Sequence, residues 1–165
     1  MANPRIDPLE LRRLFRYSPS SGKLFWRVSQ GGGVKAGDEA GCMNAKGYLR
    51  VQIKGRMYLV HVVVMTIFDR AWPEHDVDHW DRDTLNNRLP NLRHATRSQN
   101  CASTGAMKTN KLGVKGVCRD RNRYKATIMK DGKKVHLGTR ATIDEAAADY
   151  WNAAQRLHGE FARAA

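Results

Sequence analysis

Hydrophobic and polar positions in the middle of the chain predict a β-hairpin followed by a short helix. Leu49, Val51 and Ile53 alternate with polar positions, and Lys54-Gly55 supplies a tight turn, so residues 48–60 are typical of a hairpin. The β-branched run that follows has no internal breaker and is too long for one comfortable strand. We therefore expect a short helix there, ended by Pro73.

The N-terminal pattern predicts a helix and a strand with a glycine-rich segment behind them. Asp7 can cap a helix, and Pro8 is tolerated at its first position. Residues 23–28 are typical of a short strand, and the three successive glycines in 29–41 indicate a flexible connection.

The last third of the chain predicts three strands and a helix. Residues 113–121, 123–130 and 133–138 are expected as strands, with turns at Asn122 and Asp131-Gly132. Thr142 and Glu145 form the pattern of a capping box. The apolar stripe behind it is continuous at helical spacing: Ile143, Ala146, Ala147, Tyr150, Ala153, Ala154 and Leu157. Tyr124, Ala126 and Ile128 of the middle strand would face this helix.

These elements predict an α+β protein of two units. Residues 101–112 are small and polar without a period, which indicates a linker between domains at 1–100 and 113–165. The net charge is +13, with 16 basic and 10 acidic side chains in residues 1–100 and 13 and 6 in residues 101–165. Two basic halves favour two units that share one polyanion, and nucleic acid is the first candidate.

Other classes of protein fit the sequence less well. The longest apolar run, 58–68, is too short to span a bilayer, and no signal peptide is evident, so we expect a cytoplasmic protein of a bacterial host cell and no membrane partner. Cys42, Cys101 and Cys118 are odd in number and widely spaced, which argues against a zinc knuckle or a disulfide scaffold.

The polar run at residues 77–100 holds the candidate chemistry. Phosphodiester hydrolysis needs a base for the attacking water and a cation for the departing oxygen. A histidine suits the first task, and Asp and Asn oxygens suit Mg²⁺. Asp78 and His79 are adjacent, so both can serve one site only if their strand ends or bends there. A calcium loop fails on its spacing, and a solvated Asx-rich loop is the plain alternative.

The order "VDH…NNRLPNLRHAT…QN", with the lead-in "GYLRVQIKGRMYLVH", resembles the HNH endonucleases, the ββα-metal nucleases of phages and mobile elements. The resemblance covers about residues 45–100. It implies that an N-terminal ββα-metal unit precedes the small three-stranded antiparallel sheet packed on one helix.

The resemblance also implies roles for individual residues. His79 would be the general base, Asp78 and Asn100 the metal ligands, and Asn91 a hydrogen-bonding residue that holds the loop together. Asn87 joins Asn91 as a residue of the site's framework, and Arg93 would steady the scissile phosphate or serve the structure. Asn100 stands where many relatives have His, and Val62 stands where many have Arg, which leaves the role of His61 open.

Residues 113–162 resemble the apetala-type (ethylene-response-factor) DNA-binding domain, through Gly-Val, Leu-Gly-Thr, Thr-x-x-Glu-Ala-Ala and the closing Gly-Glu-Phe-Ala. This implies a sheet that lies in the DNA major groove with the helix behind it. Cys118 stands where plant members have Arg. We expect DNA contacts on the sheet face away from the helix, and from the upstream hairpin: Arg119, Arg121, Arg123, Lys125, Thr127, Lys134 and His136, with Arg50 and Arg56.

The sequence therefore predicts a homing-type or phage DNA endonuclease that needs Mg²⁺, with Mn²⁺ as the alternative ion. Its products would carry 5′-phosphate and 3′-hydroxyl ends, and its partner would be double-stranded DNA, bound by a monomer or a homodimer. The alternative is a non-catalytic DNA-binding regulator or phage packaging accessory. An RNA-directed nuclease fits less well, because a sheet suited to the major groove matches B-DNA better than A-form RNA.

Overall fold

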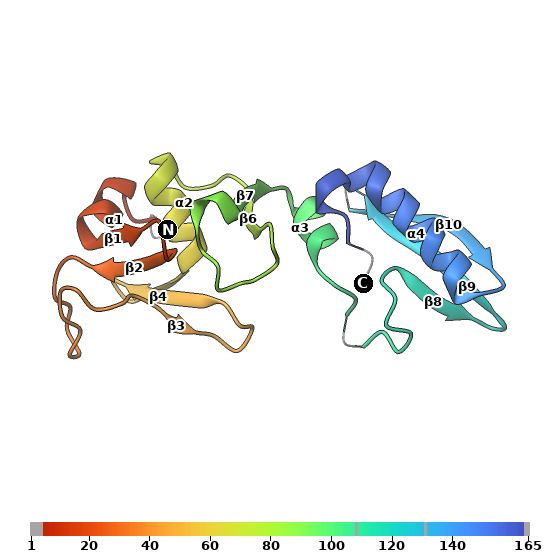
Figure 1. The fold of residues 1–165 in the computed structure, drawn as a ribbon, viewed down its shortest axis with the longest axis horizontal. Coiled ribbons are helices and arrows are strands. Elements are labelled where there is room, and N and C mark those ends of the chain that lie inside the picture. The colour runs from red at the N-terminus through yellow and green to blue at the C-terminus, as the bar shows by residue number, and fades with distance from the viewer. Residues whose placement is uncertain (1–4, 108, 131, 164–165) are drawn as a thin grey trace. The chain divides into compact units, whose positions relative to one another are not determined.

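The computed structural model describes residues 5–107, 109–130 and 132–163, and the chain forms two compact units, Met1–His94 and Ala95–Ala165 (Figure 1). Both units mix helices and strands, as the predicted α+β class requires. The division follows His94, whereas the sequence predicts a linker at 101–112. It falls earlier because Ala95, Ala102 and Phe161 pack together in the second unit, and residues 101–103 end a helix there.

The described residues of the first unit form two α-helices, one short 3₁₀ helix and three small sheets. Its sheets are the pair β1-β2, the three-stranded order β3-β4-β5 and the pair β6-β7. Its elements are α1 (Pro8–Leu14), β1 (Phe15–Ser18), β2 (Lys23–Trp26), β3 (Cys42–Met43), β4 (Leu49–Ile53), β5 (Arg56–Leu59), α2 (Val60–Asp69), β6 (Asp76–His79), η1 (Leu89–Asn91) and β7 (Leu92–Ala95).

Local sequence accounts for several of these boundaries. The Asp7 carboxylate accepts the N–H of Leu9 and caps α1. Lys54 and Gly55 both have positive φ, as the tight turn between β4 and β5 requires. Helix α2 is present as predicted, but it ends at Asp69, four residues before Pro73, with Arg70 in the left-handed conformation.

The segment 29–41 is less free than its glycines indicate. Trp26 N–H donates to the Asp38 carbonyl at 2.9 Å, and Ala40 N–H donates to the Leu24 carbonyl at 2.7 Å. The end of the segment therefore lies along β2, and the predicted flexible connection is wrong for residues 37–40. Strand β1, which the sequence pattern missed, pairs with the other edge of β2.

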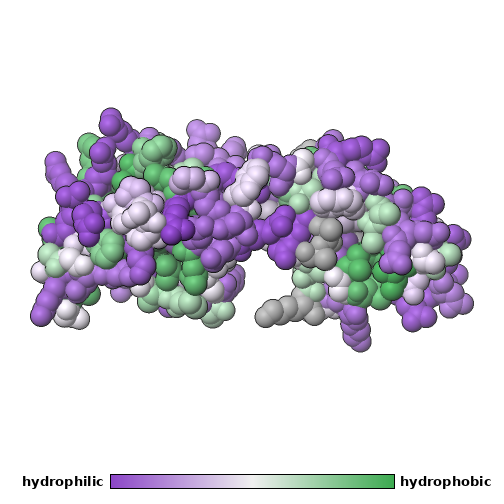
Figure 2. Space-filling view, viewed as in Figure 1, coloured by the Kyte–Doolittle hydropathy of each residue, from purple (hydrophilic) through white to green (hydrophobic). Residues whose placement is uncertain are grey.

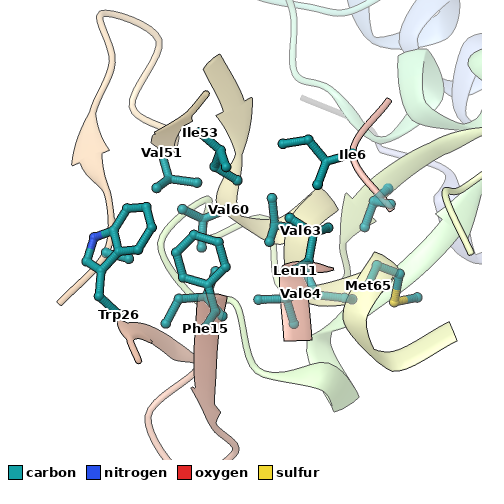
Figure 3. Packing of buried hydrophobic residues seen from close by; sticks show 14 residues of the cluster. Ile6, Leu11, Phe15, Trp26, Val51, Ile53, Val60, Val63, Val64 and Met65 are labelled. Atoms are coloured by element: carbon teal, nitrogen blue, oxygen red, sulfur yellow. The ribbon is translucent and has the colours of Figure 1, made fainter. Parts of the chain in front are cut away.

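The core of the first unit forms where α1, α2 and the strands meet. Leu11, Phe15, Val63 and Val64 are almost completely buried. Figure 3 shows these side chains gathered between the strand that carries Val51 and Ile53 and the helices. Helix α2 thus presents one apolar face to the core, which fixes the position of its first turn.

In the described part of the second unit, one long helix covers a three-stranded antiparallel sheet, and two short helices complete the unit. The strand order is β10-β9-β8. Its elements are α3 (Arg97–Ser103), β8 (Val117–Asp120), β9 (Arg123–Lys130), β10 (Lys133–Arg140), α4 (Ile143–His158) and η2 (Gly159–Phe161). The three predicted strands and the helix are present, whereas Asp131 of the predicted second turn lies outside the described residues.

Helix α4 packs on the predicted face of the sheet. Ala126 and Ile128 are buried against the helix, whose Ala146, Tyr150 and Ala153 are also buried. The predicted capping box is present, because Thr142 accepts the N–H of Glu145 and the Glu145 carboxylate accepts the N–H of Thr142. The stripe is less covered at its end, where Leu157 is 36% exposed.

Hydrophilic side chains cover most of the visible face of each unit, with smaller apolar patches between them (Figure 2). The three cysteines are exposed and unpaired, as their spacing predicts. Among the described helices, none has the length and apolar character needed to cross a bilayer.

Candidate active site

Strand β6 ends with the two residues that the polar run singles out. Asp78 is 8% exposed and His79 is 3% exposed. Because neighbouring residues of a strand point to opposite faces, the two side chains make different contacts. Asp78 pairs with Arg93, and His79 hydrogen-bonds Asn87.

The Asp78–Arg93 ion pair links β6 to its neighbour β7. Arg93 donates from Nη2 to Asp78 Oδ2 at 2.8 Å and from Nε to the same oxygen at 3.0 Å. The side chains are only 10% and 14% exposed, and the guanidinium carbon lies 4.6 Å from the centroid of the Trp80 ring. A cation is therefore held beside Asp78 by both charge and stacking.

The His79–Asn87 hydrogen bond selects one tautomer of the imidazole. His79 Nε2 lies 3.0 Å from Asn87 Oδ1. The Asn87 amide nitrogen donates to the Leu85 carbonyl at 3.4 Å, which leaves Oδ1 as the atom that faces the histidine. An amide oxygen only accepts, so Nε2 carries the proton and Nδ1 keeps its lone pair.

A second histidine packs against the first. The His61 and His79 ring centroids are 4.8 Å apart, and the Tyr48 ring lies 5.5 Å from His61 and 6.1 Å from His79. His61 Nδ1 is buried and has no hydrogen-bond partner among the described residues. Burial, together with the charge of His79, lowers the pKa of His61 to about 3. His61 is therefore neutral at physiological pH.

This lowered pKa predicts an acid-sensitive first unit. The unfolded chain takes up a proton on His61 below about pH 6.5 and the folded chain does not do so until about pH 3, so stability is lost as the pH falls between these values. Between pH 7 and pH 5, His61 alone should lower the free energy of unfolding by about 2 kcal/mol. In His61→Gln this part of the pH dependence should be absent, as measured by urea unfolding of the first unit at each pH.

The measurement can be confined to the first unit. In a Trp151→Phe background, the three remaining tryptophans (Trp26, Trp72 and Trp80) all lie there, so fluorescence reports its unfolding. His75→Gln, at an exposed histidine of the same unit, is the control and should keep the wild-type slope. An unchanged pH dependence in His61→Gln would contradict the prediction.

Asn91 holds the loop between β6 and η1 in place. Its Oδ1 accepts the N–H of Asp81 at 2.9 Å, and its Nδ2 donates to Asp81 Oδ1 at 2.8 Å and to the Asn86 carbonyl at 2.7 Å. Burial alone would raise the pKa of Asp81, but hydrogen bonds from Asn86, the Asp83 backbone and Asn91 lower it. Asp81 is thus an ionised framework residue of the loop.

The donor chemistry of the predicted metal ligands fits a hard divalent cation. Mg²⁺ is commonly held by one or two carboxylates and keeps several waters, so one aspartate with one amide oxygen is a suitable set. Asn100 lies on α3, within the second unit, and its role as a ligand with Asp78 stays a prediction. In the described part of the chain, no group of three or more His, Cys, Asp or Glu side chains is placed to hold a metal ion.

Comparison with known proteins identifies this region. The sequence pattern of the family described as HNH endonuclease matches residues 58–102. Protein 3.8 of Escherichia phage T7 is 33% identical over 89 residues, which are 53% of this chain and 73% of the phage protein. The chain belongs to the HNH endonuclease family.

A viral relative and a solved structure are also similar to parts of the chain. A protein of Acanthamoeba polyphaga mimivirus described as "Uncharacterized HNH endonuclease L560" is 36% identical over 109 residues, or 66% of this chain. The chain spans 57% of that relative's length. The solved structure described as "DNA binding and cleavage by the HNH homing endonuclease I-HmuI" has 25% identity and a TM-score of 0.40, covering 53% of this chain and 49% of the other.

The predicted DNA contacts of this HNH endonuclease are distributed over both units. Arg50 is exposed on β4, and Arg56 is half-buried on β5. In the second unit, β9 pairs Lys125 with Cys118 and Thr127 with His136, and these residues share the sheet face away from α4. We call this surface the outer face of the sheet: Cys118, Asp120, Arg123, Lys125, Thr127, Met129, Lys134 and His136.

The predicted side of Arg119 is wrong. Arg119 pairs with Tyr124, so it lies on the side of the sheet that α4 covers, and its Nε donates to the Arg121 carbonyl. Arg121 lies in the turn between β8 and β9, with positive φ. Both arginines are exposed, but at the end of the sheet and not within the outer face.

Sequence reasoning missed two tyrosines near the candidate site. Tyr48 contacts both histidine rings, and the Tyr17 hydroxyl bonds to the backbone on either side of Arg88. Tyr48 could have been found as the aromatic residue of the lead-in to the hairpin. Tyr17 left no local signal, since it lies 70 residues before its partner Asn87.

Proposed function

We propose that the first unit hydrolyses phosphodiester bonds of double-stranded DNA and leaves 5′-phosphate and 3′-hydroxyl ends. The observation that carries this proposal is the buried His79–Asn87 hydrogen bond beside the Asp78–Arg93 ion pair at the end of β6. Both contacts lie inside the segment that matches the HNH endonuclease family. The net charge of +13 suits a polyanionic substrate.

His79 acts as the general base in this proposal. Its Nδ1 takes the proton of the attacking water, because Asn87 holds the other nitrogen as a donor. His61 stays neutral beside it, so no second positive charge opposes the imidazolium that forms. Arg93 places a positive charge next to Asp78, where it can steady a phosphate group.

A divalent cation, Mg²⁺ first and Mn²⁺ as the alternative, would be held at the Asp78 carboxylate. When bound, such an ion stabilises negative charge on the departing 3′ oxygen. One site of this kind cuts one strand, so cleavage of both strands would take two events or two copies of the chain.

The test is conversion of supercoiled plasmid to nicked circle. We expect nicking with Mg²⁺ and complete loss of it with EDTA, because a cation of the proposed site is removed. The nick should be sealed directly by DNA ligase, as 5′-phosphate and 3′-hydroxyl ends require. A parallel assay with an RNA transcribed from the same plasmid distinguishes a DNA nuclease, which should leave the RNA intact, from an RNA-directed nuclease, which should cleave it.

A DNA-binding regulator or packaging accessory is the second candidate. It is favoured by the outer face of the sheet, which is basic and separate from the residues of the candidate site. Salt-sensitive DNA binding without nicking under Mg²⁺ or Mn²⁺ would support this candidate and contradict the nuclease.

We also propose that the second unit directs the protein to DNA through the outer face of its sheet, as the apetala-type resemblance implies. A two-stranded or three-stranded sheet can enter the major groove, where Arg and Lys reach guanine edges and phosphates. The exposed side chains of Arg123, Lys134 and His136 and the half-buried Lys125 support this role.

A pair of lysine variants tests the outer face at constant charge. Lys125→Ala/Lys134→Ala should lower DNA affinity about tenfold and reduce the slope of log K against log salt by about 2. Lys130→Ala/Lys133→Ala removes the same charge from residues paired on the other side of the sheet and should change affinity much less. Equal losses in fluorescence-anisotropy titrations would mean that only net charge matters.

A further inference from the structure

The N-terminal hairpin β1-β2 lies against the segment that carries Asn87. The Tyr17 hydroxyl donates to the Asn87 carbonyl at 3.2 Å and accepts the Leu89 N–H at 3.0 Å. One phenol therefore holds the backbone on both sides of Arg88. Burial outweighs the Leu89 hydrogen bond and the Arg88 charge and raises the pKa of Tyr17, so its proton stays available for donation.

Two more contacts fix the hairpin to the same segment. Arg88 Nε donates to the Ser20 carbonyl at 2.7 Å. Gly22 has positive φ, and a Cβ at this position would lie 2.7 Å from Arg88 N and 2.8 Å from the Asn87 carbonyl carbon. The turn of the hairpin thus touches the backbone of residues 87–88 with no room for a side chain.

Asn87 links the backbone held by the hairpin to His79, the candidate base. Its side chain is almost completely buried and touches His79 through the hydrogen bond that selects the Nε2–H tautomer. Hydrogen bonds weaken steeply with distance and angle. A small displacement of the 87–89 backbone would therefore weaken the Asn87–His79 hydrogen bond and reduce the preference of His79 for the Nε2–H tautomer. The family match begins at residue 58, and the hairpin lies entirely before it.

We propose that the N-terminal hairpin is a working part of the active site, in which Tyr17 is a positioning residue that orients His79 through Asn87. This inference rests on the proposed function, in which His79 Nδ1 takes a proton. The alternative is that the hairpin only completes the core through Phe15 and Leu24. The two differ in what the loss of the hydroxyl does when the ring is kept.

Tyr17→Phe keeps the ring and removes both hydrogen bonds. We expect kcat for plasmid nicking to fall about tenfold while KM stays unchanged, because DNA contacts are untouched. Tyr58→Phe is the matched control: its hydroxyl is buried in the same unit and has no hydrogen-bond partner among the described residues. That variant should keep the wild-type kcat.

A second readout needs neither DNA nor metal. Two-bond ¹⁵N–¹H spectra of the histidine rings, recorded well above the ordinary histidine pKa, report which nitrogen carries the proton. The His79 signals, assigned by their loss in His79→Ala, should show the Nε2–H tautomer in wild type and in Tyr58→Phe. Tyr17→Phe should show a mixture of tautomers.

The two readouts separate the inference from the function on which it rests. A changed tautomer with a lowered kcat supports the inference. A changed tautomer in a protein that never nicks DNA supports the link from Tyr17 to His79 and overturns the nuclease. An unchanged tautomer in Tyr17→Phe, whatever happens to kcat, overturns the inference.

Discussion

Replacing His79 by alanine should lower the rate of plasmid nicking by about 10²–10⁴-fold, the usual contribution of a positioned general base. The imidazole is almost completely buried, and its Nε2 is held by Asn87, so no neighbouring group can take over the proton at Nδ1 without rearrangement. His61 is the nearest other imidazole, but its pKa of about 3 makes it a much weaker base. DNA affinity should change by less than about twofold, because the basic outer face lies in the other unit.

His75→Ala is the matched control for this experiment. His75 is an exposed histidine of the same unit, two residues before the buried part of β6, and its loss should leave the nicking rate unchanged. Rates are compared in single-turnover assays with saturating protein, which separates chemistry from binding. Equal nicking by wild type and His79→Ala would eliminate the proposed base.

Much of the fold follows from local sequence signals. Thr142 and Glu145 form the predicted capping box at the start of α4, and Lys54-Gly55 closes the β4-β5 turn, as their residue types predict. The adjacent Asp78 and His79 fall at the end of a strand, where the polar run begins. Each of these features depends on residues within a few positions of one another.

The features that sequence could not provide depend on distant segments. The Arg93 side chain, expected either to steady a phosphate or to serve the structure, pairs with Asp78 because β6 and β7 are neighbours. Tyr17 finds Asn87 only when the N-terminal hairpin packs on the first unit. Neither contact leaves a period or a motif in the sequence.

The misplaced Arg119 has a different cause. Its charge groups Arg119 with the outer face, whereas strand alternation, counted by two from the buried Val117, places it on the side of the sheet that faces α4. The alternation of residues along the strand can be counted from the sequence, and it is a better guide than charge to the face of the sheet on which a residue lies. Arg140 illustrates the same rule: it pairs with Tyr124 and forms an ion pair with Asp149 of α4.

Gly116→Ala should destabilise the second unit by about 3 kcal/mol or more, as expected where a buried close contact is overfilled and the backbone is left-handed. A Cβ at residue 116 would clash with the ring of Tyr150 and would lie 2.6 Å from the Thr127 carbonyl oxygen, and φ is +72°. Tyr150 is buried in the contact between α4 and the sheet, so its ring cannot move aside without opening that core.

Gly113→Ala is the control that separates the cost of the clash with Tyr150 from the cost of placing alanine at a positive φ. Gly113 also has positive φ, at +68°, but no heavy atom of the described residues lies within 4 Å of its hypothetical Cβ, so its substitution should cost only about 1 kcal/mol. Hydrogen exchange followed by mass spectrometry can read both variants unit by unit. In Gly116→Ala, peptides from 123–130 and 146–154 should exchange at least about 100-fold faster, while peptides from 49–69 keep wild-type rates. Equal protection in the two variants would mean that the approach of Gly116 to Tyr150 does not hold the sheet against α4.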